Sequence, residues 1–155
     1  MSKEKIFFKS FIDFKEEFGF KELSGLLDRN NFSTRIVSNW KDDYVLSSVF
    51  QVKWVHKTPE FSAIHEDLDK QLNPNKKESN IDMFFSMSSG VSGPVHIDEE
   101  EGVHILQLHG IVIYKLKDGM YELSPGDMLK IPSGELHQAI GLTPRLTLSY
   151  GLFNK

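Results

Sequence analysis

The sequence predicts a mainly β protein, an antiparallel jelly roll with a few helices near its N-terminus. The first observation is a series of short runs rich in β-branched and aromatic residues. These runs cover residues 81–87, 103–108, 111–117, 120–123, 128–131 and 145–152. The second is a set of turn sequences between them, such as Ser88-Ser89-Gly90 and Asp118-Gly119. Many short strands at such intervals are typical of a jelly roll, whose barrel mouth is the natural pocket.

The first half of the chain contributes the helices and two further strands. Apolar residues at helical spacing predict one or two short helices over residues 6–29. Residues 32–37 and 45–54 are rich in Val, Phe and Trp, which predicts strands. A further helix is predicted over residues 58–72, because this segment begins with Thr-Pro-Glu, a typical helix start, and Asn-Pro ends it. We expect the helices to pack on the outside of the sheet.

The length of 155 residues predicts a single domain, residues 1–155. We divide it into a helical and strand-containing N-terminal extension, residues 1–79, and a metal-binding jelly-roll core, residues 80–153. A hydrophobic content of 39% is sufficient for one core. The net charge of -4 provides no basic field, so we expect neither nucleic acid nor an anionic membrane as a partner.

Cysteine usage and the N-terminus bear on the compartment. The chain has no Cys, which removes disulfides and thiolate sites and agrees with a reducing environment. The N-terminal Ile-Phe-Phe cluster is too short for the apolar core of a signal peptide, and no run approaches the roughly 20 residues of a membrane span. We therefore expect a cytoplasmic protein.

Two spaced patterns together describe one metal pocket. They are Gly90-x5-His96-x-Asp98 and Gly126-x5-Pro132-x-Gly134-x2-His137. His96 and Asp98 are two residues apart, so on an extended strand they project from the same face. His137 follows a strand end and turn that re-aim the chain. Two histidines and one carboxylate, with open positions opposite, favour non-haem Fe(II), and Mn, Ni or Zn are alternatives for the same ligands.

These spacings resemble the two motifs of the cupin superfamily. The second motif matches except at its final Asn, where this chain has Gly141. In the first motif, Asp98 replaces the usual second His, and the usual Glu falls on Gly102 or Val103. His-x-Asp with a distal His is similar to the JmjC-like branch of iron and 2-oxoglutarate oxygenases. Residues 123–140, LSPGDMLKIPSGELHQAI, look most like its ribosomal-oxygenase type. The resemblance covers roughly residues 80–152.

The resemblance implies a double-stranded β-helix (cupin jelly roll) and the activity of a 2-oxoglutarate-dependent non-haem iron dioxygenase. His96, Asp98 and His137 would be both its metal ligands and its catalytic residues. Such an enzyme uses Fe(II), O2 and 2-oxoglutarate to hydroxylate a protein side chain or a small molecule. Cupins are often dimers, so the resemblance also allows a homodimer. Two alternatives stay open: a metal-dependent cupin enzyme that does not use 2-oxoglutarate, and a non-enzymatic cupin that binds a small molecule.

The distal carboxylate of 2-oxoglutarate needs a cationic anchor. Arg145 and Thr147 share one face of the last predicted strand, and Arg-x-Thr resembles the Arg-x-Ser pair that binds this carboxylate in the wider oxygenase superfamily. In the JmjC-like branch the cation lies just after the glycine that corresponds to Gly110, where this chain has Ile-Val-Ile. Lys115, further along that strand, is therefore an alternative anchor. A further alternative is that the protein does not use this cosubstrate.

Four further residues near the motifs receive an interpretation. Tyr114 and Tyr150 are candidate hydroxyl partners of the bound carboxylate. His104 has the strand parity of the predicted metal ligands if no bulge intervenes. It is interpreted as a pocket-lining or core residue, and a fourth ligand or a substrate contact is the alternative. Trp54 is interpreted as part of the core.

Overall fold

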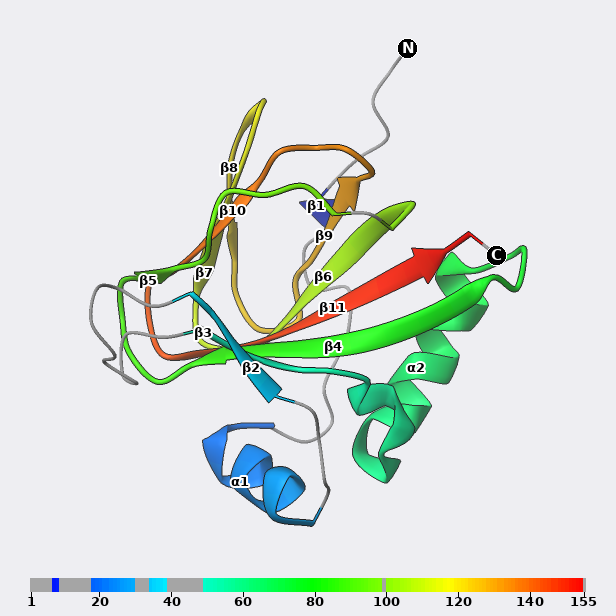
Figure 1. Ribbon diagram of the computed structural model, residues 1–155, viewed down its shortest axis with the longest axis horizontal. Coiled ribbons are helices and arrows are strands. Elements are labelled where there is room, and N and C mark those ends of the chain that lie inside the picture. The colour runs from blue at the N-terminus through cyan, green and yellow to red at the C-terminus, as the bar shows by residue number, and fades with distance from the viewer. Residues whose placement is uncertain (1–6, 9–17, 30–33, 39–48, 99, 155) are drawn as a thin grey trace.

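The structure is a computed structural model that describes residues 7–8, 18–29, 34–38, 49–98 and 100–154. Its strands form two antiparallel sheets that face each other (Figure 1). The larger sheet has the spatial order β1 (Phe7–Phe8), β9 (Met128–Pro132), β6 (Gly102–His109), β11 (Arg145–Phe153), β4 (Glu78–Ser86), β3 (Val49–Val52) and β2 (Thr34–Ser38). The smaller sheet has the order β5 (Val91–Ser92), β10 (Gln138–Gly141), β7 (Val112–Leu116) and β8 (Gly119–Leu123). The predicted mainly β jelly roll is confirmed.

Two helices cover the outer face of the larger sheet. They are α1 (Phe20–Arg29) and α2 (Pro59–Leu72), and the short 3-10 helix η2 (Val55–Lys57) leads into the second. Their apolar residues share one buried cluster with β4, β6 and β11. The prediction that helices pack outside the sheet is therefore confirmed. Phe7–Phe8, predicted as helix, instead pairs with β9 as a strand, and residues 9–17 of that predicted helix lie outside the described residues.

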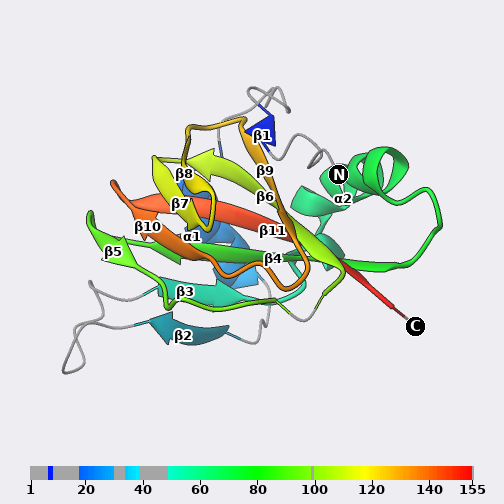
Figure 2. The same ribbon diagram turned by 90° about the horizontal axis from the view of Figure 1, so that it is seen from above.

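The strands of the larger sheet alternate between two faces with a period of two. On β11, Leu146, Leu148 and Tyr150 face the helices, while Arg145 and Ser149 line a cavity on the other side. A second apolar cluster, contributed by β6, β7, β8 and β9, fills the space between the sheets. The larger sheet extends past the smaller one through β11, β4 and β3 (Figure 2), and there its inner face is open.

Three details differ from the sequence-based predictions. β5 and β10 were not predicted, because strands of two and four residues carry too little periodicity to be recognised. Thr58 begins α2 as predicted, but its hydroxyl donates to the carbonyl of Val55 instead of capping the helix. β4 begins at Glu78, so the boundary drawn between residues 79 and 80 falls inside a strand, and the N-terminal β3 belongs to the same sheet.

Trp54 is exposed at 51%, so its interpretation as a core residue is wrong. β3 ends at Val52, and the chain then leaves the sheet and turns into η2. Trp54 adopts a left-handed backbone conformation with φ 61°, which is uncommon for a bulky side chain. Its backbone N–H donates to Asp82 Oδ1 at 2.9 Å, a bond that holds this turn at the rim of the cavity.

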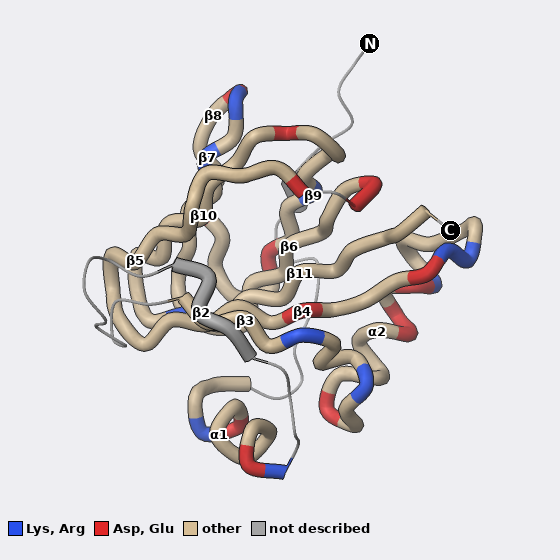
Figure 3. Tube along the Cα trace, in the orientation of Figure 1, with Lys and Arg blue, Asp and Glu red and all other residues tan. Residues whose placement is uncertain are grey.

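Charged residues of both signs are interspersed on the helices, the loops and the β7–β8 hairpin (Figure 3). None of the described helices combines the length and the apolar character that crossing a membrane requires.

Candidate metal centre

An isolated antiparallel bridge brings the two histidines together. His96 N donates to His137 O at 3.0 Å, and His137 N donates to His96 O at 2.9 Å. Residues directly opposite in such a pair project their side chains to the same side. The two imidazole centroids are accordingly 4.3 Å apart. His96 lies between β5 and β6 instead of inside a regular strand, so the predicted strand reduces here to a single bridge.

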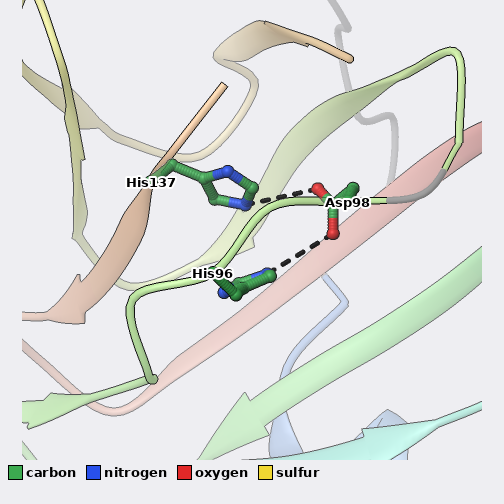
Figure 4. Close-up of side chains that lie close together, drawn as sticks. All are labelled: His96, Asp98 and His137. Carbon is green, nitrogen blue, oxygen red and sulfur yellow. Dashed lines mark ion pairs between the residues drawn. The ribbon is translucent and has the colours of Figure 1, made fainter. Parts of the chain in front are cut away.

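Asp98 lies beside the two rings and directs one carboxylate oxygen toward each of them (Figure 4). Its Oδ1 is 3.4 Å from His96 Nε2, and its Oδ2 is 3.2 Å from His137 Nε2. Ligand atoms of the three residues all lie within 4.8 Å of one another, so among the described residues this is the group that could hold a metal ion. The structure thus brings the three predicted ligands together, although His96 and His137 are 41 positions apart in the sequence.

In both histidines, a hydrogen bond to the backbone carbonyl two residues earlier fixes the same tautomer. His96 Nδ1 lies 2.9 Å from the carbonyl of Pro94, and His137 Nδ1 lies 2.9 Å from the carbonyl of Glu135. Because a carbonyl only accepts, each Nδ1 must carry the proton. Each Nε2, the nitrogen that is left to ligate a metal ion, faces Asp98.

The electrostatics suit a divalent cation. Burial alone would raise the pKa of Asp98, but hydrogen bonds with His137 and His96 outweigh it and hold that pKa well below its usual range. The hydrogen bond with Asp98 is also the main cause that raises the pKa of His96. Two imidazole nitrogens and one ionised carboxylate oxygen match the donor set of a non-haem Fe(II) site. The residues present therefore fit the ion that the fold family implies.

The site is closed on one side and open on the other. The His137 side chain is 3% exposed, whereas the side chains of Asp98 and His96 are 23% and 45% exposed. All three line a cavity of about 1250 Å³ over the open inner face of the larger sheet. This volume exceeds the roughly 300–1000 Å³ of common small-molecule sites, so it has room for more than one ligand.

Arg145 lines the same cavity and is nearly inaccessible at 2% exposure. Its Nη1 donates to Thr147 Oγ1 at 2.9 Å, while its Nε has no hydrogen-bond partner. Within the described part of the chain, no carboxylate forms an ion pair with this guanidinium. A buried cation without an anionic partner is costly, and burial accordingly lowers the pKa of Arg145. The arrangement is suited to an anion supplied by a ligand.

Tyr114 lies between the metal group and Arg145. Its ring centroid is 6.5 Å from that of His137, and its hydroxyl is close enough to Arg145 for the charge of the guanidinium to act on its pKa. Burial raises the pKa of Tyr114, although the neighbouring Arg145 opposes this effect. The hydroxyl is therefore protonated at neutral pH and can donate a hydrogen bond to an anion beside Arg145.

Three other predicted site residues do not reach the cavity. Lys115 is exposed on the face of β7 opposite to Tyr114, because neighbouring residues of a strand point to opposite sides, so it does not anchor a ligand there. Tyr150 faces the helices and donates its hydroxyl to Asp69 Oδ1 at 2.6 Å. Thr147 lies behind Arg145, where it is fully buried and accepts the arginine's hydrogen bond.

His104 is also outside the cavity, so its interpretation as a fourth ligand or substrate contact is wrong. It lies on the outer face of β6 near Tyr150, with ring centroids 6.0 Å apart. The parity argument fails because the chain bends between Asp98 and β6, where Gly102 adopts φ 129°. Burial lowers the pKa of His104 to about 4, with a smaller contribution from Lys130.

Sequence reasoning missed two residues around Arg145 and one at the cavity rim. Gln107 accepts a hydrogen bond from Thr147 at 2.7 Å, and no sequence signal connects residues 40 positions apart. Gly141 packs against the Arg145 side chain, and its departure from the second cupin motif was the available signal. His56, to which the sequence assigned no role, lines the cavity.

The two sheets, their connections and the site at the barrel mouth define a cupin-type double-stranded β-helix with a candidate metal centre. Solved structures with this fold include the ribosomal oxygenase YcfD from Escherichia coli, at TM-score 0.79 and 22% identity. The same protein in complex with cobalt and 2-oxoglutarate gives TM-score 0.80 and 22% identity. KdgF from Halomonas sp. gives TM-score 0.51 and 18% identity, with 76% of this chain and 88% of KdgF covered.

The two YcfD structures cover 97% of this chain but only 48% of their own. The chain therefore spans about half the length of YcfD. No protein-family model matches the chain, and no curated protein sequence matches it either. At these identities the likeness establishes the fold, and the site has to be interpreted from its own residues.

Proposed function

We propose that this chain is an Fe(II)- and 2-oxoglutarate-dependent oxygenase that hydroxylates a protein side chain or a small molecule. The observation that carries the proposal is the presence, in one cavity, of a His-Asp-His group and a buried arginine with no anionic partner among the described residues. A ligand with a metal-chelating end and a carboxylate at its other end satisfies both features. 2-Oxoglutarate is such a molecule.

Each residue then has a defined role. His96, Asp98 and His137 would hold Fe(II) through two neutral imidazoles and one carboxylate. Arg145 receives the distal carboxylate of 2-oxoglutarate, and the Tyr114 hydroxyl donates a further hydrogen bond to it. When bound, Fe(II) and 2-oxoglutarate supply the oxidative chemistry: O2 is reduced, the 2-oxo acid becomes succinate and CO2, and a C–H bond becomes C–OH.

The fold comparison supports the proposal. YcfD, a ribosomal oxygenase, has been crystallised with cobalt and 2-oxoglutarate, and its structure matches nearly the whole of this chain. The remainder of the large cavity, over β3 and β4, is where we place the substrate. Its rim carries Trp54 and Lys57, whose ammonium lies 4.7 Å from the indole centroid.

The test compares two cationic residues: Arg145 on β11, which lines the cavity, and Lys115 on β7, which lies outside it. Arg145→Met is expected to weaken 2-oxoglutarate binding by about 100-fold, because charge-assisted hydrogen bonds to the carboxylate are lost. Lys115→Met is the matched control, since Lys115 is exposed and outside the cavity. Binding is measured by calorimetry on Co(II)-loaded protein, and succinate formation is measured with Fe(II) and O2.

Arg145→Met is also expected to stabilise the ligand-free protein by about 1–2 kcal/mol, because it removes a buried charge that has no ion-pair partner in the described chain. Two results would contradict the proposal. Wild-type protein that binds the metal but not 2-oxoglutarate would favour a cupin that does not use this cosubstrate. A larger loss of affinity for Lys115→Met than for Arg145→Met would show that the anchor is misassigned.

A further inference from the structure

We propose that Gln107 is the positioning residue of the Arg145 anion site, that Gly141 provides its space, and that these two residues make the cavity selective for 2-oxo acids with a second carboxylate. The inference rests on the proposed function and adds the residues that determine which acid is accepted. Neither residue forms part of the candidate metal centre. One chain of buried hydrogen bonds connects β6 with Arg145 on β11.

The orientation of the Gln107 amide is fixed by its surroundings. Its Nε2 donates to the carbonyl of His109 at 2.6 Å and to the carbonyl of Gly110 at 3.0 Å. Two carbonyl oxygens can only accept, so the NH2 end of the amide must point toward them. The oxygen Oε1 is therefore directed at β11, where Thr147 lies.

The two carbonyls are themselves held by a tight turn. Gly110 adopts φ 73°, a conformation that favours glycine. A Cβ at Gly110 would lie 2.0 Å from the carbonyl oxygen of Pro144, so no other residue fits without moving the backbone. The Gln107 amide is thus bound to a rigid part of the chain.

The direction of the next two hydrogen bonds follows. Thr147 Oγ1 donates its single proton to Gln107 Oε1 at 2.7 Å, and so faces Arg145 as an acceptor. Arg145 Nη1 donates to it at 2.9 Å. Gln107 and Thr147 are fully buried, so no solvent competes for these bonds. The chain leaves one end of the guanidinium fixed and its Nε–H without a partner, available to a ligand.

Gly141 determines whether the guanidinium has room to occupy this position. A Cβ at Gly141 would lie 3.1 Å from both Cδ and Nε of Arg145, and 3.2 Å from the carbonyl oxygen of Val91. The carbonyl belongs to the paired strand β5 and has little freedom, so the arginine would have to move. The residue that departs from the cupin motif is therefore the one whose missing side chain makes space for Arg145.

The selectivity is expressed as a ratio of two dissociation constants. 2-Oxobutyrate has the metal-chelating end of 2-oxoglutarate but lacks the distal carboxylate. We expect the wild-type protein to bind 2-oxoglutarate at least about 100-fold more tightly than 2-oxobutyrate, because only the former reaches Arg145 with a negative charge. Calorimetry on the full chain loaded with Co(II) measures both constants.

Gln107→Met retains the length of the side chain and removes its hydrogen bonds. We expect it to weaken 2-oxoglutarate binding about tenfold and to leave 2-oxobutyrate and Co(II) binding unchanged, so that the ratio falls tenfold. Gly141→Ala, on the opposite sheet, is expected to lower the same ratio by a similar factor. Gln51→Met is the control, because Gln51 is also a buried glutamine, at 5% exposure, but its amide donates to Asp82 instead of supporting Arg145.

The outcomes separate the inference from the proposed function. If the wild-type protein binds neither acid, the proposed function fails and the inference fails with it. If the wild type prefers 2-oxoglutarate but both Gln107→Met and Gly141→Ala retain its ratio, the function stands and only the inference is overturned. A fall in the ratio for Gln51→Met equal to that for Gln107→Met also overturns it, since any buried glutamine would then have the same effect.

Discussion

The two faces of the larger sheet are built from the same strands but carry different chemistry. On β11, Leu146, Leu148 and Tyr150 pack into the cluster beneath α1 and α2. The alternate residues Arg145, Thr147 and Ser149 point to the other side, where two of them line the cavity. β4 repeats the pattern, since its buried apolar residues face the helices and its polar residues line the cavity.

Along each strand, the residues that stabilise the fold therefore alternate with the residues that can bind a ligand. The helix-covered face buries apolar side chains and holds the sheet together. The cavity face accepts groups that are unfavourable for folding alone, such as the buried Arg145 with its unpartnered Nε. The rigid outer packing is what allows the inner face to hold such groups in a fixed geometry. Substitutions on the two faces should therefore have different consequences.

The largest effect on folding is expected on the helix-covered face. Leu148→Ala removes a fully buried side chain from the cluster and should lower the free energy of unfolding by about 4 kcal/mol. Chemical denaturation measures this loss. Metal and 2-oxoglutarate affinities should stay unchanged as long as the protein is folded. A change of less than about 1 kcal/mol would contradict the assignment of Leu148 to the core.

A smaller, pH-dependent effect is expected for His104 on the same face. Its pKa falls from 6.5 to about 4 on folding, so between these values the unfolded chain binds more protons than the folded one. His104 therefore lowers stability as the pH decreases from 6.5 toward 4, by at most about 3 kcal/mol. His104→Phe should remove this part of the decline. If the free energy of unfolding falls equally in the wild type and in His104→Phe between pH 6.5 and pH 4, the prediction is contradicted.

The fold and the convergence of His96, Asp98 and His137 could be predicted from the sequence, because both leave a local signal. The start of α2 is specified by Thr58-Pro59, and its end at Leu72 precedes Asn73-Pro74. The long strands β4 and β11 carry the period-two pattern. The spacing of glycine and proline around the motifs indicated where the chain would bring His96 and His137 together.

The remaining features depend on packing between distant segments. The parity argument for His104 requires a continuous strand, and the chain bends before Gly102. The side of β7 on which Lys115 lies is decided by its pairing with β10, a strand too short to predict. The hydrogen bonds donated by Arg145 to Thr147 and by Thr147 to Gln107 join two strands beside a register shift, which no spacing in the sequence reveals.

If His96, Asp98 and His137 converge on one divalent ion, a metal titration of the full chain will detect it. We expect one Fe(II) or Co(II) per chain, with affinity reduced at least about 100-fold in Asp98→Ala and in His137→Ala. Glu101→Gln is the control, because Glu101 is a carboxylate only three residues after Asp98 but pairs with Lys77 instead. If Asp98→Ala and His137→Ala bind the ion as tightly as the wild type does, the three residues do not form a metal centre.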